Sequence, residues 1–437
     1  MAGKHRRVVI CTWGSLGDLH PYLAIALELE RRGHRPVIAT MEGYRGRIMG
    51  LGLSFHPVPP HLPPPGESRE VLSRALDVRR GPAYLIREIV LGNLRDAYRA
   101  TLQAVTCGGG ADVIVSHPIT LAAPIVAERT HIPWISTDLA PGTIVSAFDP
   151  PTPAPLPALR NLIAWHPTAA RLAIALVKLG LRPWSAPIHR LRAELGLPRS
   201  EDPLFEGRHS SSLGLALFSP ELAGRKPDYP PNTRITGFPF YDAAPEPAAH
   251  ARLSRFLAAG EPPILFTLGS TAVWAAGEFY RTSVAAARRL GKRALLLAGD
   301  RRNLPAGKLP TDVAAFDYLP YHLVMPHASC IVHQGGIGTT GQALRAGRPM
   351  LIVPSGYDTP DNARRCVELG VGRMLPRHRY TVDSVERALS EILDRHGLAR
   401  RAQEVGRRVS AESGTANACD AIEELLAAKA SPRHGLV

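Results

Sequence analysis

Apolar and polar positions alternate along the first forty residues in a way that predicts a strand, a helix and a second strand. The run RRVVICTW is apolar at its centre, YLAIALELERRG carries apolar residues on one helical face, and HRPVIAT returns to a strand pattern. A strand, a short loop, a helix and a strand form a βαβ unit, whose strands pair in parallel. ADVIVSHP and LAAPIVAERTHIPWISTDLA repeat the alternation, so the first half predicts a doubly wound parallel sheet.

The same alternation restarts after a proline-rich passage, RKPDYPPNTRITGFPFYDAAPEP. PPILFTLGS, KRALLLAGD and CIVHQGG have strand patterns, EFYRTSVAAARRLG has a helical pattern, and SGTANACDAIEELLAAKA predicts a closing helix. The sequence therefore predicts two Rossmann-like domains of the α/β class. We expect an N-terminal domain over 1–225, a linker over 226–247, a second domain over 248–410, and a C-terminal helix and tail over 411–437.

Composition limits the possible partners. The chain has 437 residues, of which 45% are hydrophobic and 21% charged, as expected for a globular protein with two cores. Its formal net charge of +14 favours anionic partners such as nucleotides, phosphorylated substrates or acidic membrane surfaces. The basic residues are scattered and follow no RNA-binding or zinc-finger pattern, so no nucleic acid is expected. Five cysteines without a CxxC pair predict neither a disulfide framework nor a zinc site.

Two apolar stretches bear on location. The N-terminal run VVIC is too short for a signal peptide, and the stretch from Leu172 to Leu181 is about half a membrane span and contains Lys178. We expect a cytoplasmic protein that can rest on the inner face of the membrane. The surrounding segment, 149–187, is rich in proline and contains two tryptophans; it either lines a pocket or forms a plain surface hairpin of helices.

The first candidate site is GSLGDLHP, from Gly14 to Pro21, which follows the first predicted strand. Ligands of doubly wound sheets bind at the carboxyl ends of the strands, and a glycine turn before a helix lets an anion approach the helix N-terminus. Asp18 is either a helix cap or a proton acceptor, and His20 either a capping or packing residue or a catalytic one. The glycine spacing is not GxGxxG, so the dehydrogenase fingerprint is absent.

The second candidate site is HQGGIGTTGQALRAG, which begins at His333 and leads from a strand into a helix. Amides of the glycine-rich turn, the helix N-terminus and the threonine hydroxyls are suited to bind a diphosphate. No GKS or GKT follows the glycines, so this is not a Walker loop. The alternative is a tight strand-to-helix turn without a ligand.

Together, the first motif and the longer stretch HQGGIGTTGQALRAGRPMLIVPSGYDTPDNARRCVELGVG resemble the UDP-glycosyltransferase superfamily. The resemblance is greatest to its bacterial branch of rhamnosyltransferase-like, sterol and macrolide glycosyltransferases. It implies the GT-B fold, in which two facing Rossmann-like domains enclose a central cleft and a C-terminal helix crosses back to the N-terminal domain.

The resemblance also implies roles for individual residues. Asp18 corresponds to the catalytic base. His20 is the second candidate for the base, and His117, at the strand end SHP, is a weaker candidate for assisting it. The donor diphosphate is expected on Gly14, Ser15, Gly269, Ser270, Thr271, His333, Gln334, Gly335, Gly336, Gly338, Thr339 and Thr340. The base and ribose are expected on Tyr318, Leu319 and Gln342, and the donor sugar on Asp358 and Thr359.

Several positions depart from the family pattern. Many relatives have a second histidine at Gln334, which still donates to phosphate but carries no charge. Gln342 stands where a glutamate usually holds the ribose, and Tyr318 where a tryptophan often stacks on the base. Thr359 stands where a glutamine often contacts the sugar. These positions leave open both the nucleotide and the sugar.

The implied reaction is an inverting, metal-independent transfer of a sugar from a UDP- or dTDP-sugar to a hydroxyl of a hydrophobic small molecule or lipid. Asp18 takes the proton of the attacking hydroxyl, and such help is worth roughly 10²–10⁴-fold. No DxD-like acidic pair is placed to hold Mg²⁺, so we expect no metal and no other cofactor. The alternatives are a non-catalytic nucleotide-sugar-binding or partner protein and a GT-B sugar-nucleotide epimerase.

Overall fold

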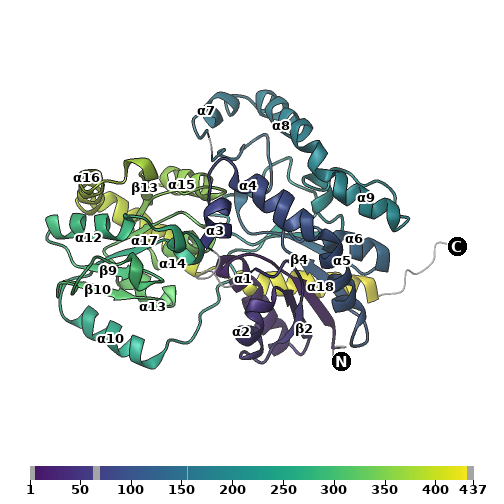
Figure 1. Cartoon of the computed structure of the whole chain (residues 1–437), viewed down its shortest axis with the longest axis horizontal. Helices are drawn as coiled ribbons and strands as arrows, with labels where there is room; N and C mark the ends of the chain where they lie inside the picture. The colour runs from purple at the N-terminus through teal and green to yellow at the C-terminus, as the bar shows by residue number, and fades with distance from the viewer. Residues whose placement is uncertain (1–4, 63–68, 155, 431–437) are drawn as a thin grey trace.

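The computed structural model describes residues 5–62, 69–154 and 156–430, and within these ranges it contains two parallel sheets packed between helices (Figure 1). In these ranges the N-terminal sheet has the strand order β3-β2-β1-β4-β5-β6-β7, and the C-terminal sheet has the order β10-β9-β8-β11-β12-β13. The strands of the N-terminal sheet are β1 (Arg7–Cys11), β2 (Arg35–Thr40), β3 (Ser54–Pro57), β4 (Val113–Ser116), β5 (Trp134–Asp138), β6 (Leu213–Ala216) and β7 (Thr233–Ile235). Those of the C-terminal sheet are β8 (Ile264–Thr267), β9 (Ala294–Leu297), β10 (Val313–Phe316), β11 (Cys330–His333), β12 (Met350–Ile352) and β13 (Gly372–Met374).

Helices connect the strands in both halves. The N-terminal half contains α1 (Leu16–Arg31), α2 (Arg45–Met49), α3 (Arg69–Ala75), α4 (Gly81–Ala83), α5 (Leu94–Thr106), α6 (Ala122–Thr130), α7 (Leu159–Ile163), α8 (Pro167–Leu181) and α9 (Ala186–Glu194). The C-terminal half contains α10 (Pro247–Ala258), α11 (Gly269–Ala272), α12 (Phe279–Arg289), α13 (Tyr321–Val324), α14 (Ile337–Ala346), α15 (Thr359–Glu368), α16 (Val382–Leu393), α17 (His396–Ser410) and α18 (Gly414–Ala430).

The central strands β1, β4, β8, β9 and β11 are mostly apolar, as expected for strands that helices cover on both faces of a sheet. Successive side chains of a strand point to opposite faces. Accordingly, Val8 and Ile10 of β1 belong to one hydrophobic cluster, whereas Val9 and Cys11 belong to another on the opposite face. The C-terminal sheet likewise lies between two clusters. The first of them also contains Ala216 and Phe218 of the N-terminal half, so the apolar core continues across the junction.

Both sheets reverse their strand order beside their first strand, between β1 and β4 and between β8 and β11. The connections that leave the two neighbouring strands run to opposite faces of the sheet, which opens a crevice at the carboxyl edge. Both predicted glycine motifs follow strands that border these crevices. Helices α1 and α14 contact each other, so the two crevices face each other across the junction of the halves.

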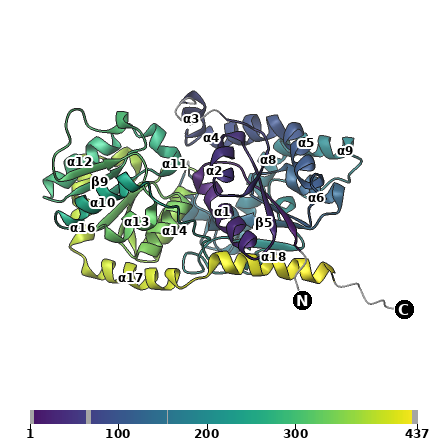
Figure 2. The same ribbon diagram turned by 90° about the horizontal axis from the view of Figure 1, so that it is seen from below.

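The last helix returns to the first half, as the sequence predicted. Figure 2 shows α17 beneath the C-terminal half and α18 beneath the N-terminal half. Arg32, at the end of α1, donates to Asp420 at 2.5 Å and to Glu423 at 2.6 Å. Cys419 and Ile422 are completely buried in the core that contains α1. The returning helix therefore ties the two halves together.

Two boundaries differ from the sequence expectation. Strand β7 pairs with β6 of the N-terminal sheet, although Thr233–Ile235 lies within the expected linker (226–247); the surrounding prolines hide this short strand. Helix α1 begins at Leu16, inside the expected turn, because Ser15 caps it. In the described ranges no helix is long and apolar enough to cross a membrane.

Candidate active site

Asp18 lies in the first turn of α1, directly after β1, and closes a capping box with Ser15. The Ser15 amide donates to Asp18 Oδ2 at 2.6 Å and its hydroxyl donates to the same oxygen at 2.9 Å. Gly14 adopts a φ of 131°, and a Cβ there would overlap Asp18 Oδ2, so a larger residue would displace the carboxylate. The helix-capping role considered for Asp18 is therefore present, and it fixes one carboxylate oxygen.

The other oxygen of Asp18 faces a buried histidine. His117 Nε2 lies 3.3 Å from Asp18 Oδ1, and His117 Nδ1 accepts from the Ile119 amide at 3.3 Å. This acceptor role leaves the proton of a neutral imidazole on Nε2, where it points at Asp18. The His117 amide also donates to the Cys11 carbonyl at 2.8 Å. Because β1 and β4 are neighbours, the sheet itself brings Asp18 and His117 together.

The surroundings of Asp18 keep it ionised. Burial raises the pKa of the carboxyl, but the hydrogen bond from His117 and the two bonds from Ser15 outweigh burial and lower the pKa below its ordinary value. Asp18 is thus a carboxylate at neutral pH. His117 was the weakest of the three candidates in the sequence, which does not show that its strand neighbours β1.

His20, the second candidate base, lies two residues further along α1. Its ring centroid is 5.1 Å from that of Tyr241, in the segment that crosses between the sheets. Burial, helped by the charge of Arg47, lowers the pKa of His20 to about 4, so the imidazole is neutral. These contacts correspond to the packing role that the sequence left open for His20.

The side chain of His333 supports the glycine-rich turn after β11. This side chain is completely buried, its Nδ1 accepts from the Gly335 amide at 3.1 Å, and its Nε2 lies 3.3 Å from Met350 Sδ. Burial lowers the pKa of His333 to about 3, so it is neutral. Gly335 has a φ of 87°, and a Cβ there would lie 2.9 Å from the Thr359 carbonyl oxygen. His333 therefore supports the turn and supplies no positive charge to it.

Gln334 lies between the two glycine turns of the C-terminal half. A Cβ at Gly269 or at Gly336 would overlap its amide nitrogen, so both glycines leave room for this side chain. Gln334 Oε1 is buried and has no hydrogen-bond partner among the described residues. Ser270 and Thr271 begin the short helix α11 and are partly exposed.

The threonines of the motif lie on the first turn of α14. Thr339 is buried, and its hydroxyl donates to the Tyr321 hydroxyl at 3.5 Å. Thr340 is completely buried, and its hydroxyl has no partner within the described part of the chain. A Cβ at Gly338 would lie 3.7 Å from Gly17 Cα. The N-termini of α14 and α1 therefore meet at this point, and both present positive dipole ends to the cleft.

Asp358 precedes α15, on the C-terminal side of the cleft. Asn362 Nδ2 donates to Asp358 Oδ2 at 2.8 Å and to the Gly335 carbonyl at 2.9 Å, so it links this carboxylate to the glycine turn. Burial raises the pKa of Asp358 to about 6, and the negative charge of Asp18 adds to the rise. Thr359 is engaged in its own loop, because its hydroxyl accepts from the Ser355 and Gly356 amides at 3.0 Å.

The base and ribose positions differ in exposure. Tyr318 is 49% exposed and offers a ring face, whereas the side chain of Leu319 is buried in the core. Gln342 Oε1 accepts from Arg345 at 2.8 Å, and Arg345 forms a bidentate pair with Asp242 at 2.7 and 2.9 Å. The sequence reading missed Asp242 and Arg345, which are separated by 103 residues.

Comparison with known proteins identifies the family. Residues 8–148 match the glycosyltransferase family 28 N-terminal domain, and residues 289–425 match the erythromycin biosynthesis protein CIII-like C-terminal domain. The O-mycaminosyltylonolide 6-deoxyallosyltransferase of Streptomyces fradiae is 32% identical over 425 residues, which cover 96% of this chain and 97% of that protein. The chain belongs to the UDP-glycosyltransferase superfamily.

Two further similarities extend this result. The sterol 3-beta-glucosyltransferase of Leptosphaeria maculans is 27% identical over 428 residues, which cover 93% of this chain and 28% of that longer protein. The crystal structure of the glycotransferase of kitacinnamycin matches with a TM-score of 0.71 at 23% identity, covering 97% of this chain and 100% of that chain. The family, the GT-B fold and the assignment as a glycosyltransferase enzyme, all predicted from the sequence, are thereby confirmed.

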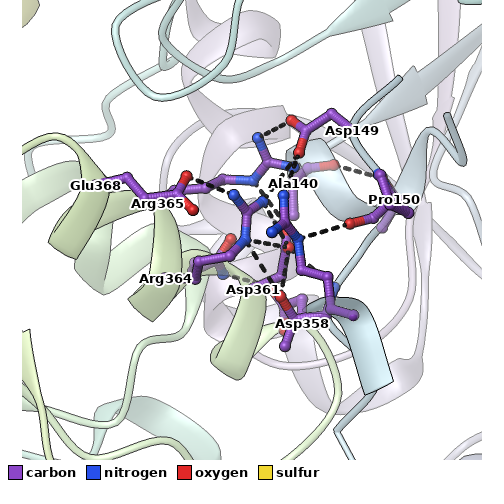
Figure 3. A network of polar contacts seen from close by, with 12 residues as sticks. Ala140, Asp149, Pro150, Asp358, Asp361, Arg364, Arg365 and Glu368 are labelled. Atoms are coloured by element: carbon purple, nitrogen blue, oxygen red, sulfur yellow. Dashed lines mark hydrogen bonds and ion pairs between the residues drawn. The ribbon is translucent and has the colours of Figure 1, made fainter. Parts of the chain in front are cut away.

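In this glycosyltransferase an ionic network joins the two halves beside Asp358 (Figure 3). Asp149, from the proline-rich loop of the N-terminal half, pairs with Arg365 of α15 at 2.6 Å and with Arg364 at 3.2 Å. Asp361 of α15 pairs with the same arginines at 2.7 and 3.0 Å. The sequence reading missed this network, although the spacing of Asp361, Arg364 and Arg365 along one helix face was a usable signal.

Proposed function

We propose that this glycosyltransferase moves a sugar from a UDP- or dTDP-sugar to a hydroxyl of a hydrophobic small molecule, with inversion and without a metal. The observation that carries the proposal is the meeting of the α1 and α14 N-termini, with Asp18 on one side of the junction and Asp358 on the other. The proposal assigns a base, a diphosphate site and a sugar-binding carboxylate to this junction.

The donor diphosphate is assigned to the turn from Gly335 to Gly338 and to the N-terminus of α14. Amide groups and the helix dipole stabilise the charge that develops on the leaving nucleoside diphosphate. His333 is neutral and buried, so the proposal gives it no charged role. The carboxylate of Asp358, held by Asn362, accepts hydrogen bonds from hydroxyls of the donor sugar.

Asp18 is assigned as the general base. As the acceptor oxygen attacks the anomeric carbon, its proton passes to Asp18, and the bond to the diphosphate breaks on the opposite face of the sugar. The anomeric configuration is therefore inverted. His117 donates to Asp18 and orients it, while Ser15 holds the other oxygen.

The proposed reaction needs no metal, because amides and two helix N-termini supply the positive potential that the diphosphate requires. Across the described residues, no group of three His, Cys, Asp or Glu side chains is arranged to hold a metal ion. Addition of EDTA should therefore leave both donor binding and turnover unchanged.

The names of the relatives support the acceptor class. The Streptomyces fradiae relative is named for transfer of a 6-deoxyallosyl group to O-mycaminosyltylonolide, and the Leptosphaeria maculans relative for glucosylation of a sterol. Both names describe hydroxylated acceptors with large apolar skeletons. We propose that the present enzyme takes an acceptor of this kind, and that its donor is a deoxyhexose, as in the more similar relative.

A thermal-shift panel of UDP, dTDP, GDP and their sugars, each with and without EDTA, tests the donor site. A ligand at 100 times its dissociation constant stabilises the folded state by about 2.7 kcal/mol, which corresponds to about 3 °C for cooperative unfolding of a chain of this size. The expected result is a shift with UDP or dTDP compounds that EDTA does not alter. Sugars of the nucleotide that binds then serve as donors in an acceptor screen with macrolide aglycones and sterols. NMR of the product gives its anomeric configuration.

Three outcomes would contradict the proposal. Absence of a shift with every nucleotide would remove the donor site. Nucleotide binding without sugar transfer to any acceptor would favour a non-catalytic nucleotide-sugar-binding protein, and release of an epimerised sugar without acceptor would favour an epimerase.

A further inference from the structure

Helices α7 and α8 expose an unusual amount of apolar surface. Eight of the fifteen large hydrophobic side chains that are exposed in the described ranges lie between residues 156 and 179. Their exposed fractions run from 41% for Leu159 to 75% for Trp165. On α8, Leu172, Leu176 and Leu179 follow the i, i+4, i+7 spacing of one helix face. This apolar face points to solvent, which is the reverse of the usual arrangement in a globular protein.

The charged residues of the same segment are all basic, although Arg160, Lys178 and Arg192 pair with acidic residues outside it. Residues 150–193 contain no aspartate or glutamate and include six lysines and arginines. A solvated surface helix normally carries both signs of charge on its exposed face. A segment that combines exposed leucine and tryptophan with an acid-free basic sequence is instead typical of helices that lie in the interface of an anionic membrane.

A basic hollow adjoins the end of α8. It has a volume of about 450 Å³ and is lined by Arg182, His189, Arg190 and Arg199 together with three apolar residues. Within the described part of the chain, none of the three arginines forms an ion pair. Burial, and then the charge of Arg199, lower the pKa of His189, which reflects the local positive potential. Arg182, which lines the hollow, directly follows Leu181, the last residue of α8, so the hollow lies at the C-terminal end of this helix.

We propose that α7, α8 and this hollow dock the enzyme on the surface of an anionic lipid bilayer. The exposed leucines and Trp165 enter the boundary between headgroups and acyl chains, and Arg182, Arg190 and Arg199 contact lipid phosphates. The protein lies on the bilayer and does not span it, since no described helix has the length and apolarity to cross. Long basic side chains are suited to this position, because their stems lie along apolar groups while their charges reach phosphate.

A bilayer fits this surface better than a second copy of the chain. In a symmetric dimer the same patch meets itself, so the three unpaired arginines of one copy would approach those of the other. Like charges brought together in this way oppose association. Anionic headgroups complement them.

The docking surface lies on the side of the molecule opposite α18. Figure 1 shows α7, α8 and α9 along one outer edge of the N-terminal half, and in Figure 2, seen from below, α18 is in front and α8 behind it. The segment continues directly from Asp149 and Thr152, which contact α15 at the cleft. Docking therefore brings the cleft near the bilayer, where hydrophobic acceptors gather. The link to acceptors rests on the proposed function, whereas docking itself does not.

Co-sedimentation of the full chain with vesicles tests the proposal. The vesicles contain either phosphatidylcholine alone or equal parts of phosphatidylcholine and phosphatidylglycerol, and each is measured at low and at physiological salt. We expect binding to the anionic vesicles that weakens with salt, and little binding to phosphatidylcholine. Each basic residue near an anionic surface contributes about 1 kcal/mol, about a fivefold change in partitioning, so the triple variant R182Q/R190Q/R199Q should bind about 100-fold more weakly.

Two further variants complete the design. The triple variant L172S/L176S/L179S should lose at least about tenfold in vesicle binding, since it removes the inserted apolar groups. The control R255Q/R301Q/K308Q makes the same change in net charge at exposed positions of the C-terminal half and should bind like the unmodified protein. Melting temperatures of all variants verify that they are folded.

Three results would overturn the proposal. One is absence of binding to anionic vesicles by the unmodified protein. Another is equal loss of binding in the control and in the R182Q/R190Q/R199Q variant, which would mean that only net charge matters. The third is a dimer in light scattering that becomes a monomer in the L172S/L176S/L179S variant without vesicle binding by either, which would identify the face as a contact between copies.

Discussion

Asp361 is the position at which the junction of the two halves is most sensitive to a small change. Its carboxylate is 2% exposed and lies 2.7 Å from Arg365 Nε and 3.0 Å from Arg364 Nη2, and it accepts from the Thr152 amide at 3.0 Å. Asp361→Asn keeps the shape of the side chain and removes its charge. Arg365, which is 5% exposed, then keeps only Asp149 as a counter-ion.

The expected loss is large because the network is buried. Removing one partner of a buried ion pair costs about 3–5 kcal/mol. With an unfolding entropy of about 2.1 cal/mol/K per residue, this loss lowers the melting temperature of the whole chain by about 3–5 °C. The matched control is Glu278→Gln, which breaks an exposed pair with Arg281 at 2.8 Å. Such surface pairs contribute about 0–1 kcal/mol, so the control should shift the melting temperature by about 1 °C or less.

The pH dependence gives the prediction a second, independent readout. Burial raises the pKa of Asp361, but the charges of Arg365 and Arg364 outweigh burial and lower the pKa below its ordinary value. A carboxyl whose pKa is depressed by folding contributes stability above its unfolded pKa of about 3.9, and that contribution is lost as the pH falls through the folded pKa. The stability difference between the unmodified protein and Asp361→Asn should therefore be full at pH 7 and shrink below about pH 4.

Calorimetric or fluorescence melts of the three proteins between pH 3 and pH 8 measure both effects. The reasoning would be refuted by a melting temperature of Asp361→Asn at pH 7 that equals that of Glu278→Gln. It would also fail if the deficit of Asp361→Asn stayed constant as the pH fell, because the loss would then not come from the carboxylate charge.

Two further predictions concern the cleft. Gly14→Ala should lower turnover at least about tenfold, because the new Cβ displaces the Asp18 carboxylate. Gly52→Ala, at a φ of 82° with open space around the Cβ, imposes similar backbone strain and should leave turnover unchanged; equal loss in both variants would contradict a specific effect on Asp18. The affinity for nucleotide-sugar relative to nucleotide alone should fall below about pH 6, where Asp358 takes up a proton. Titration calorimetry at pH 5 and pH 7.5 checks this, and an affinity ratio that does not change between them would remove Asp358 from the sugar site.

The fold could be predicted from the sequence because each half repeats a local alternation of strand and helix patterns. The strands β1, β8 and β11 are mostly apolar, which is typical of strands covered on both faces, and the two glycine motifs follow β1 and β11. The last strand of the N-terminal sheet, β7, was not predicted, because it has only three residues, Thr233–Ile235, and lies among prolines.

The site was only partly readable, because several of its contacts join residues that are distant in sequence. Asp149 and Arg365 are separated by 216 residues, and the local spacing along α15 suggests only the pair of Arg365 with Asp361. His117 neighbours Asp18 only because β4 pairs with β1. For His333 the local sequence suggested a role, because a histidine beside a glycine turn suggests a phosphate contact. Only the structure shows that its ring is completely buried.

Turnover of Asp18→Asn, compared with its affinity for the donor nucleotide, tests the central claim most directly. Release of nucleoside diphosphate is followed with the donor and acceptor found in the screen, and nucleotide affinity is measured by titration calorimetry on the same preparation. The account predicts that turnover falls by about 10²–10⁴-fold, while the nucleotide dissociation constant changes by less than about threefold, because the proposed diphosphate site is on α14. Near-normal turnover with unchanged nucleotide binding would contradict the assignment of Asp18 as the base.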